Sequence, residues 1–96
     1  MEDVIYYNNL YDLYGGLLTD KQRQYFEDYY FHNYSFSEMA ENYDVSRNAA
    51  FKQIHIVIEK LEEYERVLHL REKKKQLLKI MENAPKDIKE KVEELL

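Results

Sequence analysis

Cysteine is absent from this 96-residue sequence, and breakers of regular structure are few. Without cysteine, the chain has no disulfide framework and no thiol chemistry. Only Gly15, Gly16 and Pro85 interrupt it, too few for the many turns of a multi-stranded sheet. Together with 34% charged residues, this scarcity predicts an all-α fold.

Long apolar runs are also missing. The longest strictly aliphatic run, Ile56-Val57-Ile58, is far short of the roughly 20 residues that span a bilayer. The segment Met1–Tyr6 is acidic and lacks the basic-then-apolar order of a signal peptide. We therefore expect a soluble, cytoplasmic protein without a membrane span.

Charge and aromatic side chains are unevenly distributed. Residues 1–64 carry 12 acidic and 5 basic side chains, a net charge of −7, and all 14 aromatic ones. Residues 65–96 carry 7 acidic and 9 basic side chains, a net charge of +2. This shift predicts a boundary near Tyr64, between a core domain (1–64) and a basic helical extension with a terminal helix (65–96).

Two capping boxes mark helix starts. In each, the hydroxyl of the first residue accepts a hydrogen bond from the backbone N–H of the residue three positions on. The side chain of that later residue accepts in return from the backbone N–H of the first. The boxes are Thr19–Gln22 and Ser35–Glu38. They predict one helix that begins after Thr19 and runs to about residue 31, and another that begins after Ser35 and runs to residue 43. A further helix is expected before them, over about residues 3–14.

The second half of the chain predicts a long helix capped by Ser46. Apolar residues from Ala50 to Leu68 recur at steps of three and four and form one stripe along it. Because the apolar residues change sides beyond Leu68, the helix either runs to about Glu82 or bends once on the way. An amphipathic terminal helix is expected to fold back on it as an antiparallel hairpin through Ile88, Val92, Leu95 and Leu96.

Residues 35–54 have the pattern of a helix-turn-helix. Ala40 is small where the two helices cross, Asp44 suits the left-handed conformation of the tight turn, and Val45 fills the space between the helices. The residues expected beneath them in the core are Met39, Tyr43, Ala50 and Ile54. The predicted fold is therefore an all-α helix-turn-helix core with a long helix and a C-terminal amphipathic helix.

The start of the second helix of this motif is a candidate nucleic-acid-binding surface. In DNA-binding proteins of this kind, that end enters the major groove. Arg47 and Asn48 can make bidentate contacts with bases, and Lys52 can reach a phosphate. The full candidate set is Ser46, Arg47, Asn48, Phe51, Lys52 and His55.

Charged residues farther along the expected long helix leave the identity of the ligand undecided. Glu59, Glu62 and Glu63 follow on the same face and would repel a phosphate backbone, which favours a protein-binding scaffold. A basic stretch within 14 residues is either a solvated helix face or a patch for RNA, DNA or an acidic protein. It consists of Arg66, Arg71, Lys73, Lys74, Lys75 and Lys79.

Apolar residues outside the core stripe predict a homodimer. A terminal hairpin is too small to be stable alone, so a second chain is a natural cover for it. The candidate dimer contacts are Ile56, Val67, Leu70, Leu77, Leu78 and Met81.

No catalytic or metal-binding pattern is present. His55 and His69 lie 14 residues apart on one expected helix, about 21 Å of rise, too far to share a metal ion. Every serine and the single threonine are better used as cap or turn residues than as activated nucleophiles. We expect a protein that is not an enzyme and that uses no metal or cofactor.

Four segments in order resemble the YlxM family of small bacterial helix-turn-helix proteins, also called UPF0122. They lie within residues 10–70 and are Leu17–Arg23, Glu38–Glu41, Val45–Arg47, and Glu59–Glu62 with Tyr64–Glu65. The family fold is similar to region four of sigma factors, which reads promoter DNA. Genes of the family neighbour those of the signal recognition particle GTPases Ffh and FtsY. The resemblance therefore implies a role in that pathway or in its regulation.

The sequence departs from the family pattern beside the motif. Members often carry basic residues after position 54, where His55 and Ile56 stand, and a larger aliphatic in place of Ala50. Residues and resemblance together predict a non-enzymatic accessory or regulatory protein of the signal recognition particle pathway that binds nucleic acid. Its expected partners are DNA or the particle RNA, and the Ffh/FtsY system. A DNA-binding transcriptional regulator and a helical scaffold that binds only protein are the alternatives.

Overall fold

The computed structural model describes residues 3–96, and this part of the chain consists of helices joined by short connections, without a strand. The elements are α1 (Val4–Tyr14), the 3-10 helix η1 (Gly15–Leu17), α2 (Asp20–Tyr30), α3 (Phe36–Tyr43), α4 (Arg47–Leu68), α5 (Leu70–Ile80), the 3-10 helix η2 (Met81–Asn83) and α6 (Lys86–Leu95). The predicted all-α fold is confirmed. Within the described residues, no helix is both long and apolar enough to cross a membrane.

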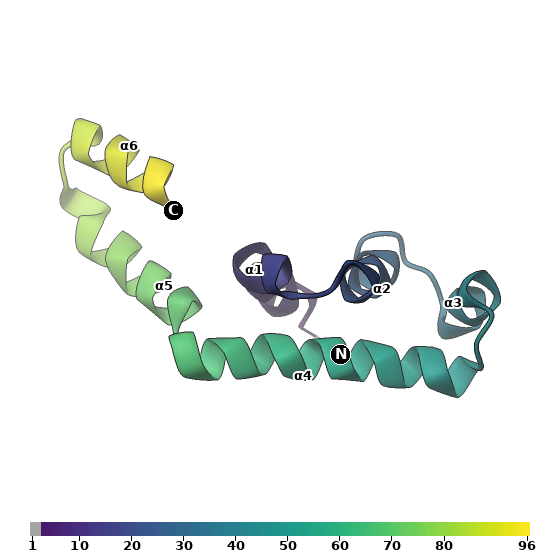
Figure 1. Cartoon of the computed structure of the whole chain (residues 1–96). Helices are drawn as coiled ribbons and strands as arrows, with labels where there is room; N and C mark the ends of the chain where they lie inside the picture. Colours follow the sequence, from purple (N-terminus) through teal and green to yellow (C-terminus); the bar gives the residue numbers. More distant parts are fainter. Residues whose placement is uncertain (1–2) are drawn as a thin grey trace.

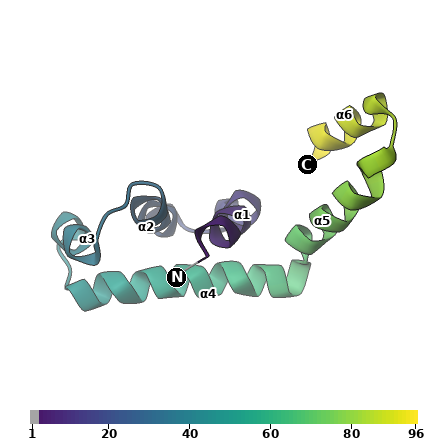
Figure 2. The ribbon, with the colours of Figure 1, turned by 180° about the vertical axis from the view of Figure 1, so that it is seen from behind.

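The long helix α4 is a platform that is covered on one side. Helices α1, α2 and α3 lie in a row along it, and α5 and α6 rise from its C-terminal end on the same side (Figure 1). The view from behind shows the same arrangement (Figure 2). The core lies between the row and α4 and includes Leu10, Tyr14, Tyr25, Phe26, Met39, Ala50, Ile54, Val57 and Leu61. The opposite side of α4 faces solvent.

Both predicted capping boxes are present. The hydroxyls of Thr19 and Ser35 accept from the backbone N–H groups of Gln22 and Glu38 at 3.1 and 3.0 Å. The Gln22 and Glu38 side chains accept in return from the backbone N–H groups of Thr19 and Ser35 at 3.0 and 3.1 Å. Each box satisfies two N–H groups that a helix start otherwise leaves without a partner, which fixes where α2 and α3 begin.

The predicted helix-turn-helix is formed by α3, a tight turn and α4. Asp44 has φ 54° and ψ 49°, the left-handed conformation expected of it. The turn is closed by the Val45 N–H, which donates to the carbonyl of the buried Ala40 at 3.0 Å. Ser46 then caps α4 by accepting from the Ala49 N–H at 3.0 Å. The tight turn sets the crossing of α3 over the first turns of α4.

The stretch that was expected to run to about Glu82, or to bend once, breaks at His69. His69 has φ 55°, a left-handed conformation that ends α4 at Leu68 and redirects the chain into α5. Neither glycine nor proline stands there, so backbone preference alone does not explain the break.

A hydrogen-bond network between α1 and the end of α4 stabilises this break. The Glu65 carboxylate accepts from the Tyr14 hydroxyl at 2.6 Å and from the N–H groups of Arg71 and Glu72 at 2.9 and 3.2 Å. The Tyr14 hydroxyl in turn accepts from the Leu70 N–H at 3.0 Å. Burial raises the pKa of the Glu65 carboxyl, but these hydrogen bonds outweigh it and hold the pKa below its usual value. We call this network the Tyr14–Glu65 junction.

The arm formed by α5 and α6 has little core of its own. Helix α6 turns back toward α5, the direction that the sequence predicts (Figures 1 and 2). Of the four residues expected to pack there, however, only Val92 is half-buried, whereas Ile88, Leu95 and Leu96 are exposed. Among the described residues of the arm, only Met81 is buried, whereas Ile80 and Leu95 are 80% and 87% exposed. The arm is therefore attached to the core mainly through the start of α5, at the Tyr14–Glu65 junction and where Arg71 lies over the Tyr6 ring.

We predict that Tyr14→Phe loosens the arm. The substitution keeps the buried ring but removes the hydroxyl that bonds Glu65 and the Leu70 N–H, which is expected to lower the free energy of unfolding by about 1–2 kcal/mol. Amide hydrogen exchange at residues 70–72 should accelerate. Tyr64→Phe is the matched control, because the Tyr64 ring packs on Tyr14 and no hydrogen bond of its hydroxyl is recorded among residues 3–96. Equal effects of the two substitutions would contradict the role of the junction.

Candidate nucleic-acid interface

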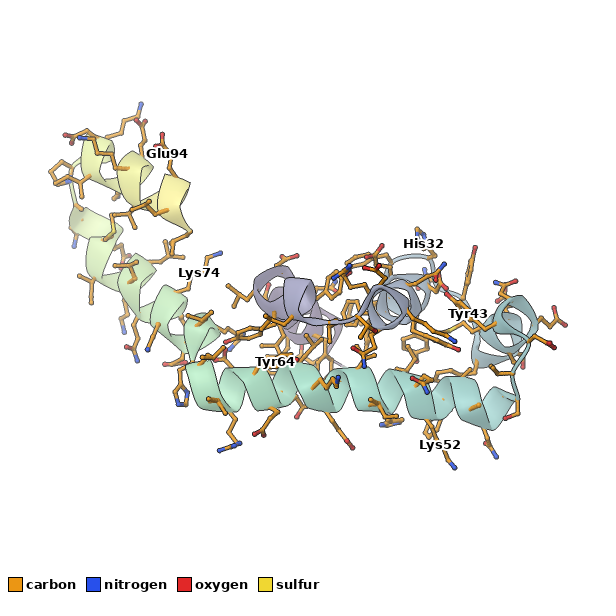
Figure 3. All side chains as sticks on the ribbon, viewed as in Figure 1. His32, Tyr43, Lys52, Tyr64, Lys74 and Glu94 are labelled. Atoms are coloured by element: carbon orange, nitrogen blue, oxygen red, sulfur yellow. The ribbon has the colours of Figure 1, made fainter. Side chains whose placement is uncertain are left out.

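The N-terminal end of α4 is exposed at one end of the molecule. Arg47, Asn48, Phe51 and Lys52 are exposed, and His55 is half-buried. Figure 3 shows the Lys52 side chain pointing away from the row of α1, α2 and α3. The structure thus brings five of the six predicted residues together on the first turns of one helix.

Ser46, the sixth predicted residue, is the N-cap of α4. Its hydroxyl oxygen accepts from the Ala49 N–H and caps the helix. The serine therefore orients the first turn of α4, and its hydroxyl is already engaged within the chain.

An aromatic row supports this surface from one side. The Phe51 ring meets Phe36 edge-on, with ring centroids 5.3 Å apart, and lies 4.3 Å from the His55 ring. Phe36 stacks on Tyr29 with centroids 5.0 Å apart. A shallow hollow of about 220 Å³ is lined by Phe36, Arg47, Asn48 and Phe51. Phe36 was not among the predicted surface residues, although its place directly after the cap of α3 sets it beside the start of α4.

The two cations of this surface are free to meet a ligand. The ion pairs in the described part of the chain are Arg23–Asp20, Arg66–Glu63 and Lys86–Glu90, so neither Arg47 nor Lys52 is neutralised by a neighbouring carboxylate. Arg47 therefore keeps its guanidinium donors available for a base edge or a phosphate.

The carboxylates that were expected to repel nucleic acid lie farther along α4. Glu59, Glu62 and Glu63 line a hollow near the C-terminal half of the helix. Glu62 accepts a hydrogen bond from Tyr7 of α1 at 3.1 Å, and Glu63 is paired with Arg66. The charge of Glu63 is thus partly offset, and Glu62 is turned toward α1, which leaves Glu59 as the unengaged carboxylate of the three.

The predicted basic stretch is not one continuous surface. Arg66 lies on α4 and donates two hydrogen bonds to Glu63, at 2.8 and 2.5 Å. Arg71 lies beyond the His69 break, with its guanidinium 4.8 Å from the centroid of the Tyr6 ring. The remaining cations are exposed on α5, namely Lys73, Lys74, Lys75 and Lys79. All of α5 lies beyond the C-terminal end of α4, far from its N-terminal end.

The candidate dimer contacts fall on two separate elements. Ile56 and Val67 are exposed on α4, whereas Leu70 and Leu78 are exposed and Leu77 is half-buried on α5. Met81 needs a correction, because it is buried within one chain, 8% exposed, beside α6. The fold-back of α6 covers it, so it is not available to a second copy in this arrangement. Homodimerisation stays a prediction.

Two helices joined by a tight turn, with the start of the second exposed, define a helix-turn-helix protein. The family model described as "UPF0122: Putative helix-turn-helix protein, YlxM / p13 like" matches residues 1–95. The chain belongs to this family, so the resemblance seen over residues 10–70 is confirmed and extended.

Curated relatives carry the same family name. The chain is 41% identical to UPF0122 protein TTE1463 of Caldanaerobacter subterraneus subsp. tengcongensis, over 84% of this chain and 69% of the relative. It is 48% identical to UPF0122 protein SH1678 of Staphylococcus haemolyticus, over 69% of this chain and 60% of the relative. It is 45% identical to UPF0122 protein OB1530 of Oceanobacillus iheyensis, over 78% and 71%. The chain thus spans about 60–71% of the length of these relatives.

Proposed function

We propose that this protein is a non-enzymatic helix-turn-helix factor that binds nucleic acid through the N-terminal end of α4. The observation that carries the proposal is the exposure of Arg47, Asn48 and Lys52 together on the first turns of that helix, with both cations unpaired. In a major groove, Arg47 and Asn48 would face base edges, and Lys52 would meet a phosphate.

The negative net charge of the chain limits its affinity for nucleic acid. Few cations are available to displace counterions, and the sequence has a net charge of −5. The exposed Phe51, supported by Phe36, adds an apolar contact of the kind that meets a thymine methyl group. We therefore expect modest affinity and a shallow dependence on salt.

We further propose that the protein acts, in the cytoplasm, as an accessory or regulatory factor of the signal recognition particle pathway. The support is the resemblance to the YlxM family, whose genes neighbour those for Ffh and FtsY. The particle RNA or DNA would be the nucleic acid, and the Ffh/FtsY system the protein partner. A transcriptional regulator would use the same end of α4, and the net charge of −7 in residues 1–64 favours a purely protein-binding scaffold as the other alternative.

We predict that Arg47→Ala weakens binding to duplex nucleic acid by about 1–3 kcal/mol, because one bidentate contact is lost. The affinity can be measured by fluorescence anisotropy at fixed salt. Arg66→Ala is the matched control, since Arg66 lies on the same helix but is paired with Glu63 at the other end. An unchanged affinity of Arg47→Ala, or an equal loss with Arg66→Ala, would contradict the proposed docking.

For the pathway, we predict that the tagged protein recovers Ffh together with the particle RNA from its own cytosol at about 100 mM salt. The variant Lys73→Ala/Lys74→Ala/Lys75→Ala should release Ffh while far-UV circular dichroism stays unchanged. Recovery of discrete chromosomal fragments without Ffh would instead identify a transcriptional regulator and overturn the pathway assignment.

A further inference from the structure

Another hollow lies between α1 and α5, away from the solvent-facing side of α4. It has a volume of about 260 Å³, and its lining residues are Asn9, Asp12, Leu13, Arg71, Lys74, Lys75 and Leu78. Figure 3 shows Lys74 leaving α5 on the side that faces α1. We call this site the α1–α5 hollow. It exists because the break at His69 turns α5 back toward the side of α4 that carries α1.

The hollow combines apolar walls with a cationic rim. Leu13 is half-buried and Leu78 is 42% exposed, so both present apolar surface that nothing in the described chain fully covers. No carboxylate within residues 3–96 forms an ion pair with Arg71, Lys74 or Lys75. Three cationic residues and a single carboxylate, that of Asp12, therefore line the hollow.

Arg71 is held in place before any partner arrives. Its backbone N–H donates to Glu65 at 2.9 Å, and its guanidinium lies over the Tyr6 ring. A guanidinium fixed in this way loses less side-chain freedom on meeting a carboxylate than a freely moving lysine does.

We propose that the α1–α5 hollow docks an acidic amphipathic helix of a partner protein. One apolar side chain of that helix enters between Leu13 and Leu78, and its flanking carboxylates meet Arg71, Lys74 and Lys75. This is the groove mode in which a helix presents apolar anchors at steps of three and four. The hollow is smaller than the roughly 300–1,000 Å³ of small-molecule pockets, which suits one side-chain anchor.

Charge and lining both favour a protein over a nucleic acid here. No aromatic ring lines the hollow, so bases have nothing to stack on. Asp12 and two leucines face the space that a phosphate backbone would occupy. The proposal is independent of nucleic-acid binding by α4, which lies at the other end of that helix, so either can fail without the other.

The test uses the full chain and a fluorescein-labelled synthetic helix of about 18 residues, five turns long. The helix carries leucine at every third or fourth position and glutamate at the others. Fluorescence anisotropy should show saturable binding that weakens about tenfold or more in Lys74→Glu/Lys75→Glu, because attraction becomes repulsion. Leu78→Ser should weaken binding several-fold by removing one apolar wall. Thermal melting confirms that each variant is folded.

The matched control is Lys73→Glu/Lys79→Glu, which makes the same charge change on the same helix outside the hollow. Its binding should stay within about twofold of the wild type. The proposal would be overturned if both double variants weakened binding equally, or if a probe with serine in place of leucine bound equally well. Either result would mean that the probe is held only by non-specific charge attraction. No binding of the probe would overturn it as well.

Two further results would identify another occupant and so overturn the proposal. The first would identify RNA as the occupant: polyuridylic acid displaces the probe, Lys74→Glu/Lys75→Glu abolishes RNA binding, and Leu78→Ser leaves RNA binding unchanged. The second is a wild-type sedimentation mass of two chains that Lys74→Glu/Lys75→Glu reduces to one.

Discussion

The hydrogen bond from the Tyr14 hydroxyl to Glu65 is the interaction on which the arrangement of this protein depends. It joins two residues 51 positions apart and holds the buried face of α1 against the end of α4. The same carboxylate binds the first free N–H groups of α5, so it stabilises the left-handed turn at His69. The change of side of the apolar residues beyond Leu68 allows a bend here, and the junction stabilises the left-handed turn that forms it. With it, the arm leaves the core in a defined direction.

The length of α4, 22 residues, separates two surfaces. The N-terminal end of α4 carries Arg47, Asn48 and Lys52, whereas the cations of α5 lie beyond the break at the other end, and Lys74 faces α1. In a molecule 53 Å long and about 25 Å across, one small ligand does not reach both. Two surfaces of different chemistry suit a protein that joins a nucleic acid to a protein partner, as the proposed pathway role requires.

The parts of the fold that could be predicted from the sequence are those with local causes. The capping boxes and the cap at Ser46 act within one helical turn, and the tight turn at Asp44 depends on its own backbone conformation. The phase of the apolar stripe also determines which side of α4 is buried, which is why Arg47, Asn48 and Lys52 were correctly expected to face outward.

The remaining features depend on contacts between distant segments. The break at His69 is stabilised by hydrogen bonds of the Tyr14 hydroxyl. The apolar spacing of the sequence identifies Tyr14 only as a core residue and does not predict these bonds. The apolar pattern placed a possible bend beyond Leu68 but not the direction of the chain after it, so the sequence could not show that the basic stretch is divided or that α1 and α5 enclose a hollow. The burial of Met81 likewise required the position of α6. A nuclear magnetic resonance titration of the full chain with duplex DNA would distinguish the two surfaces. We expect chemical-shift changes at residues 46–55, with residues 71–78 unchanged; changes centred on α5, or spread equally over both segments, would show that the two surfaces do not act separately.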